Sequence, residues 1–308
     1  MDILNTILPV FAIIAIGYAL RWFGYFSKAF AEGLNSMAYW VGLPALLFYR
    51  TAIAEYDLGA AWSIYLIVVF GMCCTTAAGL LASRLFRMPA DRSAIMIQGA
   101  FRGNLVYIGL PIIVYSLAGD GAASAESLAV IVIALTVPVY NMLAVIILLL
   151  GRHKLDRSAL PRIAKGIFTN PLLISSILGI IYNFTFDSLN PIALRTLSAV
   201  AQMALPLALF SIGATLFDER ITGNLLPTTI GSIMKTFISP AAGLMLAAFL
   251  GVGGTELRIA LLLLACPTAV ASHVMAEQII GKQPLSASIV LLSTLLSIVA
   301  FAIILALF

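Results

Sequence analysis

The sequence predicts an all-α membrane protein with ten transmembrane helices, arranged as two inverted repeats of five helices. Three observations predict this fold class: the composition, the spacing of the apolar segments and an internal repeat. Of the 308 residues, 62% are hydrophobic and only 10% are charged, and the mean hydropathy is +1.10. A soluble domain carries about 25% charged residues, so this composition indicates a protein that folds in lipid.

Ten apolar segments are long enough to cross a bilayer, which takes roughly 20 residues per helix. The first segment lacks a basic start and a small-residue cleavage site, so we expect it to remain as a helix and not to be a signal peptide. The connections are short, and the longest polar stretch is residues 151–165. The predicted spans are 3–22, 31–52, 59–83, 93–118, 127–150, 165–184, 195–217, 226–250, 256–280 and 285–307.

The loop cations predict the orientation, because Lys and Arg concentrate in cytoplasmic loops. With the N-terminus outside, the outer loops hold only Arg50, Arg195 and Arg258. Both termini are therefore expected on the non-cytoplasmic side of the cell membrane. Arg102 and Lys235 fall inside predicted spans. The cations assigned to the cytoplasmic side are Arg21, Lys28, Arg84, Arg87, Arg92, Arg152, Lys154, Arg157, Arg162, Lys165, Arg220 and Lys282.

The two halves of the chain match at an offset of 162 residues, which aligns Pro9 with Pro171 and Gly17 with Gly179. Because each half holds five spans, an odd number, the second half is inverted relative to the first. Inverted repeats are typical of secondary transporters. The predicted organisation is a first repeat over 1–151, a basic cytoplasmic linker over 152–164 and a second repeat over 165–308. Ser36 also aligns with Ser198, Leu43-Pro44 with Leu205-Pro206, and Leu47-Phe48 with Leu209-Phe210.

Two predicted spans carry a helix breaker near their middle. Gly103 lies about ten residues into span 93–118 and Pro267 about eleven into span 256–280, which places both roughly 15 Å deep in a ~30 Å core. The backbone groups freed by a break must face protein or a wet cavity. The N-terminal ends of the half-helices offer partial positive charge to an anion. Substrate sites of transporters lie at such breaks, so Gly103 and Pro267 are predicted to belong to the site.

Arg102 and Asn104 flank the first break and are the main substrate-binding candidates. An arginine in mid-membrane costs at least ~2.5–3.5 kcal/mol on insertion scales, so it should face a cavity or a partner. Its planar guanidinium suits a carboxylate. The alternatives are a structural arginine that holds the freed carbonyls and an asparagine that caps a helix.

Three further side chains are predicted to act in coupling or gating. Lys235 lies about ten residues into its span, where it can snorkel to the cytoplasmic interface. We expect a structural or gating role, and direct contact with the ligand is the alternative. His273 follows the second break and is either a neutral packed histidine or a proton-coupling group. Glu277 lies one turn further, near the inner end of its span.

Weaker substrate-binding candidates are polar side chains within other parts of the spans. For Thr268 and Ser272 the alternative is a bond to their own helix, as hydroxyl groups in spans often form. These candidates are Thr268, Ser272, Asn35, Thr136 and Asn141.

Several other classes of function lack the residues they need. Cys73, Cys74 and Cys266 form neither a disulfide framework nor a metal-binding spacing, and we expect no metal, no cofactor and no nucleic-acid partner. An intramembrane enzyme would need a nucleophile with a base, and a membrane ligand sensor would need an output domain or a docking loop. A cation/proton antiporter of the same fold would need acidic residues at the midplane, and it is the alternative within transport.

The chain resembles the auxin efflux carrier family, which includes the plant PIN carriers and bacterial permeases. The resemblance covers essentially the whole chain and rests on the order and spacing of several segments. These are Leu43 to Phe48, Asn104 to Pro111, Asn170-Pro171, Lys235 to Pro240, and Pro267 to Glu277 followed by a Ser-rich last span.

The resemblance implies broken spans 4 and 9 that cross, as in the bile-acid symporter and sodium/proton antiporter folds. It also implies a scaffold of spans 1, 2, 6 and 7 that forms a homodimer, with spans 3–5 and 8–10 as a moving transport unit. Asn104 and Pro267 match residues that shape the substrate site of the plant carriers. Those carriers have proline near Arg102-Gly103, which disfavours auxin and favours a more strongly anionic ligand. No carboxylate lies in Pro267 to Ser272, so no sodium site of the bile-acid-symporter type is expected.

The sequence thus predicts a secondary transporter of a small organic anion that works by elevator-type alternating access. The anion is a mono- or dicarboxylate, auxin-like or malate-like. His273 is the candidate group for proton coupling, with a neutral packed histidine as the alternative.

Overall fold

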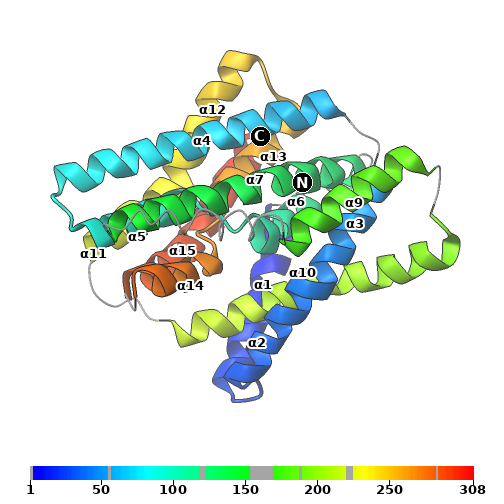
Figure 1. Cartoon of the computed structure of the whole chain (residues 1–308), viewed down its shortest axis with the longest axis horizontal. Coiled ribbons are helices and arrows are strands. Elements are labelled where there is room, and N and C mark those ends of the chain that lie inside the picture. The colour runs from blue at the N-terminus through cyan, green and yellow to red at the C-terminus, as the bar shows by residue number, and fades with distance from the viewer. Residues whose placement is uncertain are drawn as a thin grey trace. The chain divides into compact units, whose positions relative to one another are not determined.

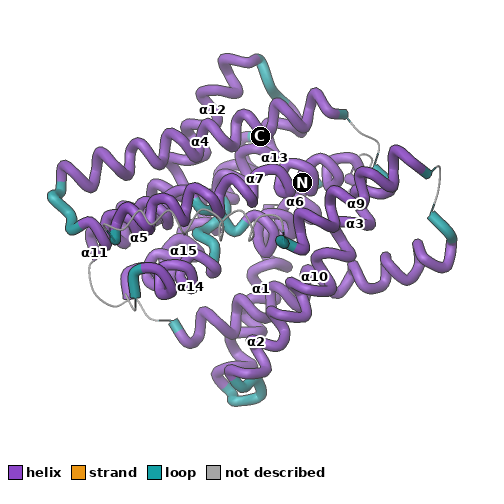
Figure 2. Tube along the Cα trace, in the orientation of Figure 1, coloured by secondary structure: helices purple, strands orange, loops and turns teal. Residues whose placement is uncertain are grey.

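The computed structural model is helical over the described part of the chain, where no β-strand occurs (Figures 1 and 2). The chain forms two compact units, and both units contain segments that lie far apart in the sequence. The structure describes residues 3–54, 57–117, 122–152, 169–186, 189–219, 225–281 and 284–308. Most of the predicted linker, residues 153–164, lies outside this part.

The first unit comprises residues Met1–Ala61, Val106–Leu135 and Gly166–Asp218. It includes the first half of α7, a helix that continues into the second unit, and most of the π-helical turn η2 (Leu105–Gly109). Its other elements are α1 (Ile3–Trp22), α2 (Lys28–Met37), η1 (Ala38–Gly42), α3 (Leu43–Ala52), α6 (Leu110–Ser116), α9 (Pro171–Thr185) and α10 (Pro191–Asp218).

The second unit comprises Trp62–Leu105, Thr136–Lys165 and Glu219–Phe308. It contains most of α4 (Leu58–Leu85) and the second half of α7 (Ala122–Gly151). Its other elements are α5 (Ala90–Phe101), α11 (Leu225–Ile233), η3 (Met234–Ile238), α12 (Ser239–Leu250), α13 (Gly254–Ala265), α14 (Val270–Ile279) and α15 (Pro284–Leu307).

Six helical segments of the described chain are long and apolar enough to cross a membrane: Ile3–Trp22, Leu58–Leu85, Ser124–Gly151, Pro191–Asp218, Leu225–Leu250 and Pro284–Leu307. The prediction of an all-helical membrane protein is therefore confirmed. The other four predicted spans have a different form. Spans 93–118 and 256–280 are interrupted, span 31–52 contains a π-helical turn, and span 165–184 is helical from Pro171 to Thr185.

Each π-helical turn ends immediately before a Leu-Pro or Ser-Pro pair. The prolines that follow η1, η2 and η3 are Pro44, Pro111 and Pro240. Proline lacks the N–H of a regular helical bond, and its ring clashes with the carbonyl four residues before it. The wider π-helical turn accommodates this clash without ending the helix. At Pro44 the helix thus continues from η1 into α3 without a break.

Glycines bring the helices of the first unit into close contact. A Cβ at Gly17 of α1 would collide with the backbone of Phe210 in α10, and a Cβ at Gly179 of α9 would collide with Phe48 and Thr51 in α3. Small residues at helix contacts are the usual means by which helices pack in lipid. Gly17 and Gly179, like Phe48 and Phe210, are partners under the 162-residue offset. The same contact therefore occurs twice, with the two halves of the chain exchanged.

Candidate functional site

The two helix breaks lie side by side within the second unit. Helix α5 ends at Phe101 and α13 ends at Ala265. Gly103 and Thr268 then pair as an isolated antiparallel bridge. The Asn104 N–H donates to the Pro267 carbonyl at 2.8 Å, and the Ala269 N–H donates to the Arg102 carbonyl at 3.0 Å. These bonds satisfy backbone groups that lipid could not, and we call this bridged region the crossing.

Side chains satisfy two further backbone groups at the crossing. The Thr268 hydroxyl donates to the Gly99 carbonyl at 2.7 Å, in the last turn of α5. The Thr268 N–H donates to the Ser293 hydroxyl of α15 at 3.0 Å. The alternative prediction for Thr268, that its hydroxyl bonds to its own helix, is therefore wrong, because the hydroxyl donates to α5. Thr268 instead joins both broken helices to α15.

Lys235 is completely buried, and its ammonium donates to the Leu264 carbonyl in the last turn of α13. A cation at a helix C-terminus interacts favourably with the helix dipole. A Cβ on Gly103 would lie 3.0 Å from the Lys235 Cε atom, so the lysine side chain lies against the crossing. The alternative in which Lys235 snorkels to the interface is wrong, because none of the side chain is exposed.

Arg102 lies in the extended backbone between α5 and η2, and only 7% of it is exposed. Its Nη2 donates to the Asn141 Oδ1 of α7 at 2.7 Å. Its Nη1 lies 3.5 Å from the Ser272 hydroxyl and 4.0 Å from the Met275 Sδ, both on α14. The structure thus brings together three residues that the sequence predicted separately: Arg102, Asn141 and Ser272.

The N-terminus of α14 adds positive potential to this region. The helix begins at Val270, and Ser272 lies in its first turn. The first N–H groups of a helix lack carbonyl partners within the helix and favour an anion. Arg102 and Lys235 add full positive charges, so the crossing combines two cations with a helix N-terminus.

Three buried polar groups on α5 and α7 lack hydrogen-bond partners in the described part of the chain. They are the Thr136 Oγ1 and Tyr140 hydroxyl of α7 and the Gln98 Nε2 of α5. Gln98 lies one turn before Arg102, and its carbonyl accepts the Arg102 N–H. The Tyr140 ring packs edge-on against Phe101, with the ring centroids 6.0 Å apart. Buried polar groups without a partner are rare and call for an explanation such as a water or ligand.

Sequence reasoning missed Gln98, Tyr140 and Ser293. Gln98 is a polar residue within a predicted span, and Ser293 belongs to the Ser-rich last span, so both gave a weak signal. Tyr140 gave none, because an aromatic residue in an apolar helix predicts only packing.

Three predicted residues have contacts of their own. Asn35 belongs to the first unit, where its Oδ1 accepts from the Tyr107 hydroxyl at 3.0 Å. His273 contacts Ser286 through Nδ1 at 2.8 Å, and its Nε2 lies 3.9 Å from Glu277.

The sequence of the whole chain fits one known family. The family model described as "Membrane transport protein" matches residues 2–305. The chain belongs to the membrane transport protein family. This membership confirms the resemblance to the auxin efflux carriers.

Relatives in the membrane transport protein family are similar along almost their entire length. An uncharacterized transporter of Methanocaldococcus jannaschii is 23% identical over 97% of this chain and 96% of its own length. One of Methanothermobacter thermautotrophicus is 25% identical over 96% and 95%. A protein of Rhizobium meliloti named "Putative malonate transporter" is 28% identical over 96% and 93%. All three are described as transporters, which confirms that the chain is not an enzyme but an integral membrane transporter.

Proposed function

We propose that this protein is a secondary transporter of a small organic anion and that the anion binds at the crossing. The main support for the proposal is that Lys235 is fully buried. Its ammonium donates to the Leu264 carbonyl, and its side chain lies against Gly103. Burying a charge costs several kcal/mol unless a partner compensates it. A carbonyl compensates only part of that cost, and a bound anion would supply the rest.

The guanidinium of Arg102 supplies the directional contact. Its bond to Asn141 at 2.7 Å fixes one edge of the plane, while the Nη1 contacts at 3.5 and 4.0 Å are long for hydrogen bonds. A carboxylate that approaches the Nη1 side would gain a short charge-assisted bond. Ser272 and the first turn of α14 would add donors, and Asn104 remains a proposed contact.

A dicarboxylate matches the charge of this site better than a monocarboxylate. Two buried cations balance two negative charges, and the malonate description of one relative agrees with a short dianion. We therefore propose a malonate-like or malate-like substrate. Thr136 supports this assignment, because its buried hydroxyl lacks a partner and could donate to a second carboxylate.

The proposed mechanism is elevator-type alternating access by inverted repeats. The exchanged contacts of Gly17 with Phe210 and Gly179 with Phe48 support the repeat. In this proposal ten spans form a dimeric scaffold of spans 1, 2, 6 and 7 and a moving unit of spans 3–5 and 8–10. Both termini lie on the non-cytoplasmic side, Pro267 and Gly103 permit the crossing, and protons are coupled through His273.

Counterflow in proteoliposomes tests the proposed function. Vesicles loaded with malonate should accumulate external labelled malonate, and excess malate should compete more strongly than acetate. Arg102→Gln should reduce the initial rate by at least about tenfold, because a charge-assisted bond is lost. Arg258→Gln is the matched control in the same unit, since Arg258 instead binds the carbonyl of Phe308. Equal rates for the two variants would contradict the proposed site.

A further inference from the structure

The helix that follows the second break carries a titratable cluster that the anion site does not use. His273 of α14 lies between two carboxylates, with its Nε2 3.5 Å from Glu219 and 3.9 Å from Glu277. Its Nδ1 lies 2.8 Å from the Ser286 hydroxyl of α15. The side chains of His273 and Glu219 are both 18% exposed, so their charges are only partly screened by solvent. Two of the four residues, Glu219 and Ser286, were not predicted from the sequence.

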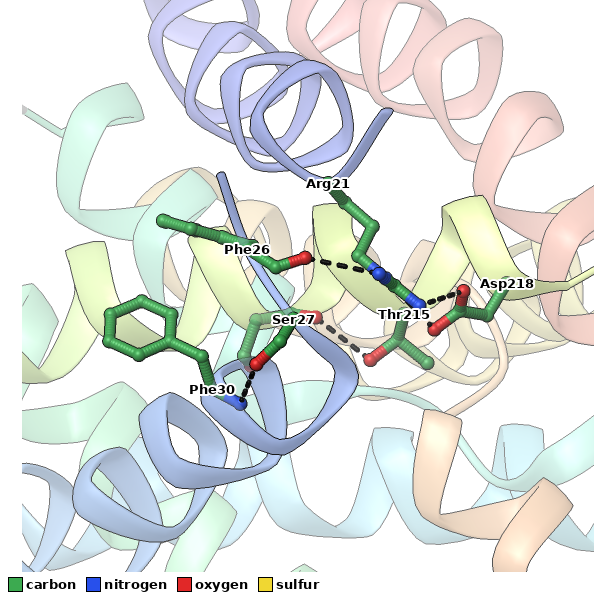
Figure 3. A network of polar contacts seen from close by, with 7 residues as sticks. Arg21, Phe26, Ser27, Phe30, Thr215 and Asp218 are labelled. Atoms are coloured by element: carbon green, nitrogen blue, oxygen red, sulfur yellow. Dashed lines mark hydrogen bonds and ion pairs between the residues drawn. The ribbon is translucent and has the colours of Figure 1, made fainter. Parts of the chain in front are cut away.

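Glu219 occupies a special place in the chain, because it is the first residue of the second unit. The preceding residue, Asp218, is the last residue of the first unit. Asp218 binds Arg21 of α1 through two bonds of 2.8 and 3.3 Å, as Figure 3 shows. Arg21 also donates to the Phe26 carbonyl at 3.1 Å. Two consecutive acidic residues therefore contact different units, Asp218 through Arg21 and Glu219 through His273.

The other charged groups on the elements around His273 do not replace this arrangement. Helix α15 carries no charged residue between Pro284 and Leu307, and α5 carries Asp91 and Arg92 in its first turn. Arg152 of α7 donates to the Ile279 carbonyl at the end of α14, at 2.8 Å. Arg102 meets α14 at Ser272 and Met275. Glu219 and Glu277 are thus the carboxylates with described contacts to the imidazole.

We propose that His273, Glu219 and Glu277 form a proton-binding site that latches the start of the second unit to α14 when a proton is bound. The protonated imidazole attracts both carboxylates. Loss of the proton removes this attraction and leaves two negative charges beside a neutral ring. At 3.5 Å, a neutral ring contributes little through hydrogen bonding alone. The latch is therefore closed while the imidazole carries its second proton and released when that proton is lost.

This site would give a transporter a means to link proton binding to the junction of its two units. Arg21, unlike histidine, carries a permanent charge, so the contact of Asp218 with Arg21 does not depend on this proton. Only the attachment to α14 changes with pH. The inference does not depend on which anion is carried, and its test needs no substrate.

A double-mutant cycle on the full chain in lipid nanodiscs tests the latch. The melting temperature would be measured at pH 5.5 and pH 8.0 for the wild type, Glu219→Gln, His273→Gln and the double variant. Each single variant should lower Tm by about 2 °C or more at pH 5.5 and have a much smaller effect at pH 8.0. The double variant should lower Tm no further than the larger single change, because both substitutions remove one interaction.

Asp218→Asn is the matched control, since it removes the neighbouring acid whose partner does not titrate in this range. Its effect on Tm should be the same at both pH values. Additive single effects, or equal effects of Glu219→Gln at both pH values, would overturn the proposal. Should a variant fail to fold, amide exchange of wild-type peptides that contain Glu219 decides the question. After correction for intrinsic exchange rates, protection should be higher at pH 5.5, and equal protection would refute the latch.

Discussion

The two units of this transporter hold their cations in different ways. Two cations of the first unit pair with carboxylates: Arg21 with Asp218 at 2.8 Å and Arg50 with Glu126 at 2.7 Å. In the second unit, Lys235 donates to a backbone carbonyl and Arg102 to an amide oxygen. The first arrangement compensates the charge internally, so those cations stabilise structure. The second places two cations at the crossing, where we propose that a substrate anion binds.

The helices of the two units also pack differently. In the first unit, α1 and α10 approach until glycine is required at both Gly17 and Gly213. The second unit instead interrupts two helices and rejoins them through the Gly103–Thr268 bridge. The difference suggests a rigid helix pair in one unit and a polar, adaptable site in the other. The predictions that follow test this contrast, from the largest expected effect to the smallest.

The largest effect is expected in the first unit, for Gly213→Ala. The added Cβ would collide with the Ile14 carbonyl and lie 2.8 Å from the Tyr18 backbone nitrogen. Backbone cannot move aside as a flexible side chain can, so the cost should reach about 3 kcal/mol or more. The measurement is the yield of monodisperse protein and its Tm. Gly33→Ala is the control, since a Cβ there meets no atom within 4 Å, and an unchanged Tm for Gly213→Ala would contradict the close packing.

Lys235→Met should weaken malonate binding strongly while changing the stability of the fold only slightly. The variant leaves the Leu264 carbonyl without its donor, at a cost of about 1–3 kcal/mol, but it also removes the burden of a buried charge. We therefore expect a Tm within about 4 °C of the wild type. Malonate affinity should fall at least about tenfold, because a buried cation is lost. Full affinity in a folded Lys235→Met protein would show that this cation serves structure alone.

Gly103→Ala should disturb the crossing moderately. The new Cβ would lie 3.0 Å from the Lys235 Cε and 3.1 Å from the Leu105 Cδ2. Lys235 is fully buried and bonded to Leu264, so it has little room to yield. The expected loss is about 1–2 kcal/mol of stability, measured by thermal unfolding, with reduced malonate counterflow. Wild-type values for both would mean that the crossing is looser than the distances indicate.

The smallest effect on the fold is expected for Thr136→Val. Valine has nearly the shape of threonine and removes a buried hydroxyl that lacks a partner, so stability should stay the same or rise by about 1 kcal/mol. If Thr136 contacts the anion, the KM for malonate should rise while Tm does not fall. A lower Tm with unchanged KM would assign the hydroxyl to structure.

Patterns local to the chain predicted much of the fold. The first helix runs from Ile3 to Trp22, as its apolar segment predicts, and the helices break at the residues around Gly103 and Pro267. Breakers and apolar length act over a few residues, so one sequence suffices to locate them. The family also followed from the order of motifs along the chain.

The contacts that make the site could not be predicted in the same way. Thr268 donates to Gly99, which is 169 residues away, and Arg102 meets Asn141 on another helix. Such partners depend on how helices rotate and pack, which hydropathy does not encode. The burial of Lys235 depends on η3, where a π-helical turn before Pro240 changes the direction of the side chains. The acceptor of its ammonium, the Leu264 carbonyl, is a backbone group that no residue type reveals.

The most direct test of the anion site is a calorimetric titration of malonate into the purified protein in nanodiscs, with Arg102→Gln and Arg258→Gln in parallel. Malonate should bind saturably to the wild type and to Arg258→Gln. It should bind at least about tenfold more weakly to a folded Arg102→Gln. Equal affinity in all three proteins, or no binding of any mono- or dicarboxylate, would contradict the assignment of the crossing as an anion site.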